Sequence, residues 1–239
     1  FSGTLTSNGG SGDCYGAYPG TLVIVDTTNN DLTVKTSQTW YSNPAMDGSV
    51  HSFHKMTVQN STILTLKGYY TNDTDGVGFV FNLNEFQLDT GSSLNSDLAG
   101  YAGGAGAHPN GYGPGAGTTT CGGAERGGGS YGGIGGGTNY GTPYSSAFTP
   151  DKLGSGGARN GCTENAGGAG GGAIKLNVAT TTTINGTITA KGGAANRASS
   201  GSGGGIWMIS TDMAGNGIIN ADGGIGFNGG CNVGGGGGR

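Results

Sequence analysis

Charged residues are scarce in this sequence: among 239 residues there are 10 Lys and Arg and 14 Asp and Glu, a net charge of -4. Without an excess of basic residues the chain lacks the electrostatic footprint that binds a phosphate backbone, which argues against nucleic acid as a partner. Long apolar runs are also missing, since the longest, such as Thr21–Val25 and Ile206–Ile209, are far too short to span a membrane. We therefore expect no nucleic-acid partner and no membrane span.

Proline is rare, with 6 residues, and no window shows sustained helical periodicity. Glycine is abundant instead, with 58 residues, and each glycine inside a helix costs about 1 kcal/mol relative to alanine, so helices are disfavoured. The glycines cluster and do not recur at every third position, which excludes collagen. Hydrophobic residues still make up 33% of the chain, including 10 Tyr, 7 Phe and 2 Trp. That is too much packing material for a fully disordered chain.

The chain divides into three zones, which we interpret as one continuous domain. Residues 1–98 carry short segments rich in β-branched and aromatic residues, which predict a β-rich part of the same architecture or a small sandwich. Residues 99–172 are dominated by glycine with recurring tyrosines, and are interpreted as an ordered layer of loops, with disorder as the alternative. Residues 173–239 contain an internal repeat. The strand-like segments predicted before this repeat are Thr21–Val25, Leu32–Val34, Lys55–Val58, Thr62–Leu66 and Gly78–Leu83.

The repeat unit is a short strand, a Gly-Gly turn, a polar loop and a cluster of glycines. Gly186–Gly193 reads GTITAKGG and Gly217–Gly224 reads GIINADGG, while Gly3–Gly10, at the start of the chain, reads GTLTSNGG in the same frame. After its loop, the copy at Gly186 continues into the strand-like run Gly203–Ile209. One such unit cannot bury its apolar face, whereas stacked copies bury a continuous one. The sequence therefore predicts an all-β fold, a parallel β-helix or solenoid with long glycine-rich loops.

The glycine-rich stretches also resemble a known kind of protein. Asp97–Tyr101, Ser130–Gly133, Leu153–Gly157 and Gly167–Ile174 look like segments of large secreted proteins with a pectin-lyase-like parallel β-helix. The resemblance covers about residues 90–239 well and residues 1–25 more weakly. Members are mostly surface or extracellular proteins, so the resemblance implies an architecture more than an activity.

Four cysteines, Cys14, Cys121, Cys162 and Cys231, lie in polar, glycine-rich stretches. None forms a C-x-x-C pair and no histidine is near them in sequence, so zinc binding and thioredoxin-like chemistry are disfavoured and structural disulfides are favoured. Cys14 and Cys231 occupy corresponding loops of the first and last copies, and a bond between them would link neighbouring subunits. Four cysteines allow three pairings, and all three stay open.

Three N-x-S/T sequons begin at Asn60, Asn72 and Asn185. Together with the loop cysteines and the low charge, they predict a secreted eukaryotic protein that carries N-linked glycans. We therefore expect an extracellular or cell-surface location.

Residues that could support catalysis are few. Polysaccharide lyases of the resembled fold use clustered carboxylates to hold calcium, but only Asp73 and Asp75 lie close together in sequence, in a turn where acids commonly cap the backbone. Calcium at this pair is a weak expectation, and no other cofactor and no catalytic residue are predicted. His51 and His54 lack a third metal ligand nearby. A threonine array for ordering ice, around Thr180–Thr183, is disfavoured because its pattern changes between copies.

The functional prediction is therefore structural, and the chain is not expected to be an enzyme. The copies at the two ends of the sequence are incomplete, which favours stacking of identical chains head to tail into an extracellular filament or surface appendage, such as a mastigoneme (flagellar hair), an adhesin or a matrix fibre. A cut from a longer β-helix is the other interpretation of these ends. The alternative function is a carbohydrate-binding or polysaccharide-cleaving β-helix protein.

Overall fold

The computed structural model describes residues 24–120, 126–160, 165–227 and 233–239. These residues contain fifteen β-strands and no helix, so the prediction of an all-β chain is confirmed. Because no helix is present in these ranges, none of their segments qualifies as a membrane-spanning helix.

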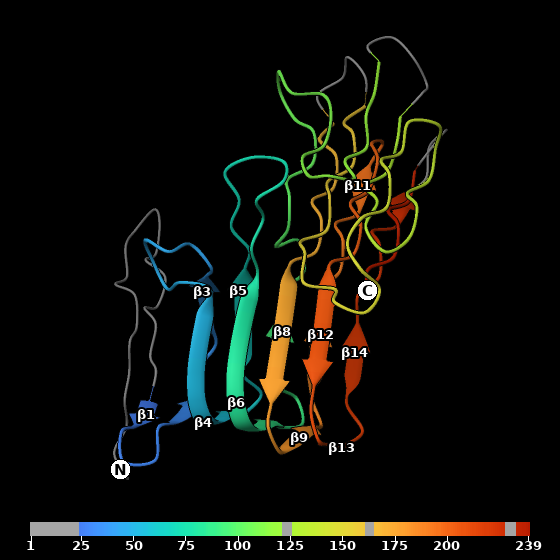
Figure 1. Cartoon of the computed structure of the whole chain (residues 1–239). Helices are drawn as coiled ribbons and strands as arrows, with labels where there is room; N and C mark the ends of the chain where they lie inside the picture. Colours follow the sequence, from blue (N-terminus) through green and yellow to red (C-terminus); the bar gives the residue numbers. More distant parts are fainter. Residues whose placement is uncertain (1–23, 121–125, 161–164, 228–232) are drawn as a thin grey trace, which may run out of the picture.

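The strands form two main sheets that lie against each other (Figure 1). The first sheet has the order β1 (Ile24–Asp26), β2 (Asp31–Val34), β4 (Val50–Val58), β6 (Phe79–Leu88), β8 (Ala173–Val178) and β12 (Gly205–Ile209), with β9 (Thr181–Ile184) and β13 (Asp212–Ala214) attached to it through β6. The second sheet has the order β3 (Gln38–Tyr41), β5 (Ile63–Lys67), β7 (Ser93–Asn95), β10 (Thr187–Thr189) and β14 (Ile218–Asn220). A small third sheet pairs β11 (Ala195–Asn196) with β15 (Gly226–Phe227).

Neighbouring strands in these sheets run parallel, apart from the antiparallel hairpin of β1 and β2. The repeat found in the sequence is also the register of one of these pairs. Thr187, in the copy that starts at Gly186, lies opposite Ile218 in the copy that starts at Gly217. Parallel pairing therefore places equivalent residues of successive copies side by side.

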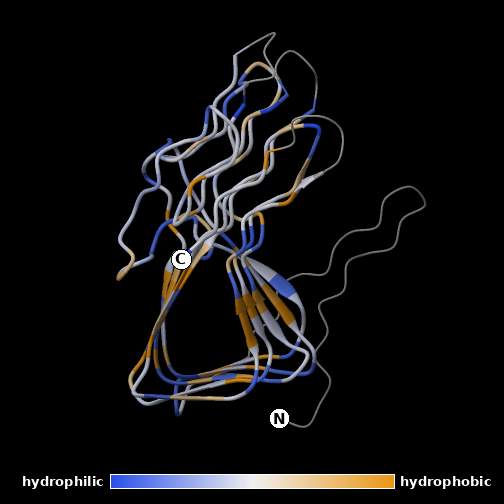
Figure 2. Cartoon of the chain, turned by 90° about the vertical axis from the view of Figure 1, so that its right-hand side faces the viewer, coloured by the Kyte–Doolittle hydropathy of each residue, from blue (hydrophilic) through white to orange (hydrophobic). Residues whose placement is uncertain are grey.

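The core consists of rows of apolar side chains that run across the strands. One row contains Leu64, Leu94 and Ile188, which face one another in register and are fully buried. Such rows follow from strand alternation, because residues two apart point to the same face of a strand. In Figure 2 the strands and their turns lie around one interior. The burial of these rows shows that their side chains are enclosed. At about 1.5–3 kcal/mol for each fully buried aliphatic side chain, the rows supply most of the hydrophobic stabilisation of the strands.

Above the strands lies a second layer, the glycine layer, made of residues 99–120, 126–160, 165–172, 190–204, 221–227 and 233–239 (Figures 1 and 2). Its extended segments bond in several directions, unlike the strands of a sheet, which have two neighbours. Residues 153–158 exchange backbone hydrogen bonds with residues 99–104, 109–117, 126–133, 165–172 and 199–204.

The hydrogen bonds of the glycine layer repeat every three residues. The N–H groups of Gly154 and Gly157 donate to Gly171 and Gly168 of one neighbouring segment. In the same way, Ser199 and Ser202 donate to Ala158 and Ser155, Gly201 and Gly204 to Gly193 and Ala190, and Ser200 and Gly203 to Val233 and Gly236. A period of three is also the period of the polyproline II conformation. The segments of the glycine layer that share this period bond to each other sideways.

Close packing explains the glycines of this layer. A Cβ atom at Gly156 would lie 1.9 Å from the carbonyl oxygen of Ala102, and one at Gly204 would lie 1.8 Å from that of Gly172. Tyrosines fill the remaining space: Tyr101 and Tyr131 are buried, and the hydroxyl of Tyr101 accepts a hydrogen bond of 2.7 Å from the Gly76 N–H. Burial raises the pKa of both phenols, which therefore stay protonated at neutral pH.

Candidate functional site

One end of the two sheets, formed by β12, β13 and β14, is an open edge, apart from the Ile206 N–H of β12, which donates to the Arg239 carbonyl oxygen at 2.8 Å. Within the described part of the chain each of these strands has one partner strand, namely β8, β9 and β10. All three lie at the same end, opposite β1 and β3 (Figure 1). We call the surface formed by β12, β13 and β14 the open end.

Core rows run out into solvent at the open end. The row of Leu64, Leu94 and Ile188 continues to Ile219, whose side chain is 49% exposed although its three predecessors are fully buried. The row that passes through Phe86 and Thr182 ends at Met213, which is 57% exposed. These residues are of the same apolar kind as the buried core, and they are exposed only because no further strand covers them.

The main-chain groups at the open end point outward as well. Ile218 donates its N–H to Gly186 and Asn220 accepts from Ala190, both at 2.9 Å, so these two residues bond toward β10. Since bonding sides alternate along a parallel strand, the N–H and C=O of Ile219 point away from β10. A hollow of about 170 Å³ lies between Ile184, Met213 and Ile219. The open end thus offers a bonding edge, exposed apolar side chains and a cavity to fill.

The opposite end is covered differently. Leu32 and Val34 of β2 and Trp40 of β3 are all buried. β1 pairs with β2 in the antiparallel direction, through Ile24 opposite Thr33. The two ends therefore present different surfaces, as a head-to-tail contact between copies requires.

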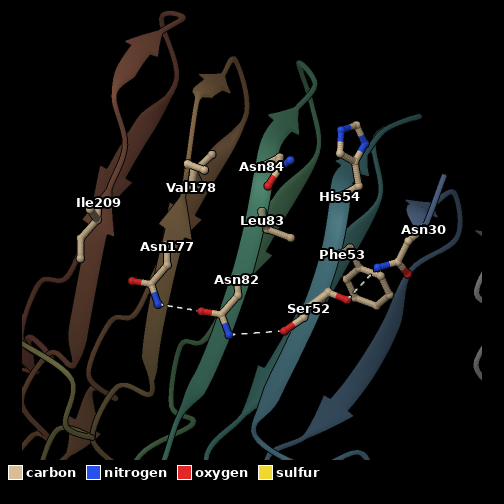
Figure 3. Close-up of a pocket in the computed structure, with 11 residues that line it drawn as sticks. Asn30, Ser52, Phe53, His54, Asn82, Leu83, Asn84, Asn177, Val178 and Ile209 are labelled. Atoms are coloured by element: carbon tan, nitrogen blue, oxygen red, sulfur yellow. Dashed lines mark hydrogen bonds between the residues drawn. The ribbon is translucent and has the colours of Figure 1, made fainter.

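A second candidate site is an amide-lined groove of about 580 Å³ on the outer face of the first sheet (Figure 3). Asn177 donates its amide to Asn82 at 2.9 Å, and Asn82 donates to the Ser52 hydroxyl at 3.4 Å, so one row of polar side chains crosses three strands. His54 lies in the groove and contacts Asp31 at 2.9 Å through Nδ1. Beside the row, the Lys175 ammonium lies 3.6 Å from the centre of the Trp207 ring. This surface offers amide donors and acceptors at the spacing of the strands.

The groove was not predicted from the sequence. The signal was available in the alternation of Phe81-Asn82-Leu83 and Leu176-Asn177-Val178, which places an asparagine on the outer face of each strand. Registering those two segments against each other would have put the two amides side by side.

The three sequons occupy different environments. Asn60 and Asn72 are exposed, the first at φ 62° after the end of β4 and the second in the loop that follows β5. Asn185 is half-buried in the short turn between β9 and β10, with its N–H bonded to Leu88. The four cysteines, Cys14, Cys121, Cys162 and Cys231, lie outside the described residues.

Asp73 and Asp75, the pair at which calcium is weakly expected, bond to different parts of the chain. The Asp75 carboxylate accepts from the Thr71 N–H at 2.9 Å and from the Thr71 hydroxyl, whereas the Asp73 carboxylate accepts from the distant Gly113 N–H at 3.0 Å. The Thr71 hydroxyl, followed by the backbone of Asn72, lowers the pKa of Asp75, as expected for a carboxylate that caps its own loop. Among the residues with described placement, no three His, Cys, Asp or Glu side chains gather as metal ligands.

His51 and His54 lie on opposite faces of β4. The His51 ring packs against Trp40, Phe79 and Phe81, with ring centres 5.2–5.7 Å apart. Burial lowers the pKa of His51, and its Nε2 has no hydrogen-bond partner. With His54 in the outer groove, the two rings do not form a shared metal site.

Comparison with protein-family models, with curated proteins and with solved structures gives no match to this chain.

Proposed function

We propose that this chain is a parallel β-solenoid that serves as a structural subunit, stacking head to tail into an extracellular filament or surface appendage. Register spacing supports the solenoid: Leu64 and Leu94 are 30 residues apart, Ile188 and Ile219 31, and Ile174 and Ile206 32. Asp31 and Lys55 are 24 residues apart and Gln38 and Leu64 are 26, whereas the 94 residues between Leu94 and Ile188 include most of the glycine layer. Parallel partners separated by intervals of this order, with long loops inserted in one of them, are the expected result of winding one coil after another.

The observation that carries the proposal is the exposed end of the core row at Ile219. Covering the remaining half of an isoleucine side chain is worth about 1 kcal/mol, and Met213 adds a similar amount. The β14 edge, Ile218–Asn220, contains no charged residue and no proline, and such an edge invites a further strand. A partner that supplies the next coil satisfies both demands at once. A head-to-tail contact that continues the direction of strand stacking repeats without closing.

An extracellular location and N-glycosylation complete the proposal. They are supported by the exposed sequons at Asn60 and Asn72, which leave room for a glycan on the side of the solenoid. A glycan there leaves the β12, β13 and β14 edges free.

Sedimentation and electron microscopy of the purified chain at rising concentration test the proposal. We expect rods whose length grows with concentration, and Ile219→Lys should abolish them by placing a charge in the covered row. Ile63→Lys is the matched control, because Ile63 is 45% exposed in the same sheet but faces outward from an interior strand. Monomers of the parent chain at all concentrations, or equal loss of rods in both variants, would count against assembly through the open end.

The second candidate function is carbohydrate binding at the amide-lined groove. Asn82 and Asn177 support this function, since neutral amides suit the hydroxyl groups of a glycan. The residues that line the groove include no carboxylate, whereas glycoside hydrolysis uses two, so binding is favoured over cleavage. Affinity electrophoresis in gels with neutral or acidic polysaccharides tests it: Asn82→Ala should restore free migration, while Asn196→Ala, away from the groove, should not.

A further inference from the structure

We infer that the glycine layer binds a small oxyanion, a sulfate ion or the carboxylate of a small organic acid, at the buried guanidinium of Arg126. The Arg126 side chain bonds to Arg197, the residue that follows β11. β11 lies in the part of the glycine layer that is distant from the two main sheets (Figure 1). The site is separate from the open end and from the amide-lined groove, so the inference does not depend on the proposed assembly.

Arg126 carries a positive charge that the fold removes from water. The residue is only 7% exposed. A guanidinium stays protonated in proteins, so this side chain cannot become neutral in response to burial. Burial of a lone charge is costly, and buried charges in proteins are therefore paired with an opposite charge. The burial of Arg126 thus calls for a negatively charged partner.

The described residues do not supply that partner. None of the ion pairs among them includes Arg126 or Arg197. The Nη1 atom of Arg126 donates to the carbonyl oxygen of Arg197, which is a neutral acceptor. The Nε atom is buried and has no hydrogen-bond partner. A buried donor of this kind indicates a bound water or ion that satisfies it.

The geometry of the guanidinium favours an oxyanion. The Nε and Nη2 atoms of an arginine lie on one edge of its plane and donate two parallel hydrogen bonds to two oxygens of a carboxylate, sulfate or phosphate. Because Nη1 of Arg126 already bonds to Arg197 and Nε has no partner, this edge is the one that a ligand can use. A chloride ion has a single centre and cannot accept both bonds in this parallel arrangement. The site should therefore prefer oxyanions to chloride.

A second buried donor without a partner belongs to the same part of the layer. Ser199 is fully buried, and its hydroxyl has no hydrogen-bond partner. The Ser199 N–H donates to the Ala158 carbonyl oxygen at 2.9 Å, and the Ala158 N–H donates to the carbonyl oxygen of Gly127 at 3.0 Å, so the segments of Ser199 and Arg126 flank the same chain. An oxyanion offers several acceptor oxygens, which suits a hydroxyl as well as a guanidinium.

Arg197 favours a negatively charged ligand over water alone. It is exposed and lies at φ 57°, a backbone region that residues other than glycine seldom adopt. Residues held in such strained conformations cluster at sites that clamp ligands. The bond from Arg126 to its carbonyl oxygen keeps two positively charged residues next to each other. Their combined field attracts an anion.

Thermal unfolding of the full-length chain in chloride, acetate and sulfate at equal ionic strength tests the inference. Replacing chloride with acetate or sulfate should raise the Tm by about 5–10 °C at a concentration about a hundredfold above the Kd, and the increase should saturate. Arg126→Met should remove the saturable part. Arg159→Met is the matched control, because Arg159 is a half-buried arginine of the same layer whose Nη1 donates to the Gly106 carbonyl oxygen, and it should keep the increase. An increase with sulfate alone supports an inorganic ion, and an increase with both anions supports a carboxylate ligand as well.

The stability of the Arg126→Met chain in chloride alone provides a second test. Loss of an unpaired buried charge should leave the Tm unchanged or raise it. A fall of about 10 °C or more in every anion would instead indicate that a carboxylate of the chain pairs with Arg126, and it would overturn the inference.

Two further measurements apply if Arg126→Met does not fold. Arg126→Lys keeps the charge but loses the two parallel donors, and it should weaken oxyanion binding about tenfold or more. Crystals of the parent chain grown with selenate, which replaces sulfate, should show its anomalous signal within hydrogen-bond distance of the Arg126 Nε. Equal Tm increases in the parent chain and in Arg126→Lys, or a water molecule at Nε in those crystals, would contradict an oxyanion site.

Discussion

Replacing Gly156 with alanine is expected to lower the free energy of unfolding by about 3 kcal/mol or more. The added Cβ would lie 1.9 Å from the Ala102 carbonyl oxygen and 2.8 Å from the Gly103 nitrogen, whereas ordinary contacts are 3.4–4 Å. The segment must therefore move by more than 1 Å. That movement strains two buried hydrogen bonds, from Gly156 to Tyr112 at 2.9 Å and from Gly117 to Gly156 at 3.0 Å. A broken buried bond costs about 1–3 kcal/mol, and overpacking adds about 1–3 kcal/mol.

Thermal and urea unfolding, followed by circular dichroism, measure this effect. For a chain of this size the expected loss corresponds to a fall in Tm of about 6–12 °C. Gly237→Ala is the control, because an added Cβ there meets nothing within 4 Å, and it should be neutral or stabilising by up to about 1 kcal/mol. A Gly156→Ala chain that unfolds within about 1 kcal/mol of the Gly237→Ala chain would refute the argument that backbone contact dictates glycine in this layer.

Three further predictions concern other parts of the molecule. Burial lowers the pKa of His51 below its ordinary 6.5, so its contribution to stability is fully present above that pH and falls as the solution is acidified through it. His51→Phe should therefore reduce the loss of unfolding free energy that urea unfolding measures between about pH 7.5 and about pH 5.5. Asp97→Ala should destabilise by about 1–3 kcal/mol, because its carboxylate accepts from the Lys191 N–H at 2.6 Å, while the exposed Asp151→Ala should change stability by less than about 0.5 kcal/mol. In a eukaryotic secretory host, glycopeptide mass spectrometry should find Asn72 occupied and Asn185 largely unmodified, since only the former is exposed; the reverse order would contradict the surface described for the two sites.

Much of the strand layer could be predicted from the sequence, because its signal is local. Leu32–Val34 and Thr62–Leu66 alternate apolar and polar residues, and the structure has β2 and β5 there, each shifted by one residue at one or both ends. Lys55–Val58 was predicted too short, since β4 begins at Val50. Its first half contains two histidines and a serine, which strand propensities do not favour. β3, at Gln38–Tyr41, was missed because the strand depends on tertiary packing around the buried Trp40 and not on a local pattern.

The glycine layer could not be predicted in detail. Side-chain patterns reveal which face of a strand is buried, but glycine has no side chain to pattern. Bonds such as Gly154 to Gly171 and Ser200 to Val233 join segments far apart in sequence. Their partners follow from the stacking of the strands below. The tyrosines carried a usable signal, because the buried Tyr101 and Tyr131 mark places where the layer has room for a ring.

The open end could be predicted from the sequence only in part, through the repeat to which β14 belongs. Equivalence of Gly186–Gly193 and Gly217–Gly224 was visible in the sequence, and the structure places them in direct register. The exposure of Ile219 was not visible, because an apolar residue at a core position looks the same in sequence whether or not another strand covers it.

The three-residue period of the glycine layer limits how such a chain can vary in length. Inserting one residue into 153–158 would turn every later N–H by about a third of a turn, so donors now aimed at 165–172 would point to a different neighbour. Three inserted residues restore the directions and lengthen the segment by about 9 Å. In the strands below, an insertion of two residues keeps every later side chain on its original face of the sheet. Natural length variants of this fold should therefore differ by threes in one layer and by twos in the other, with odd changes confined to the connecting turns.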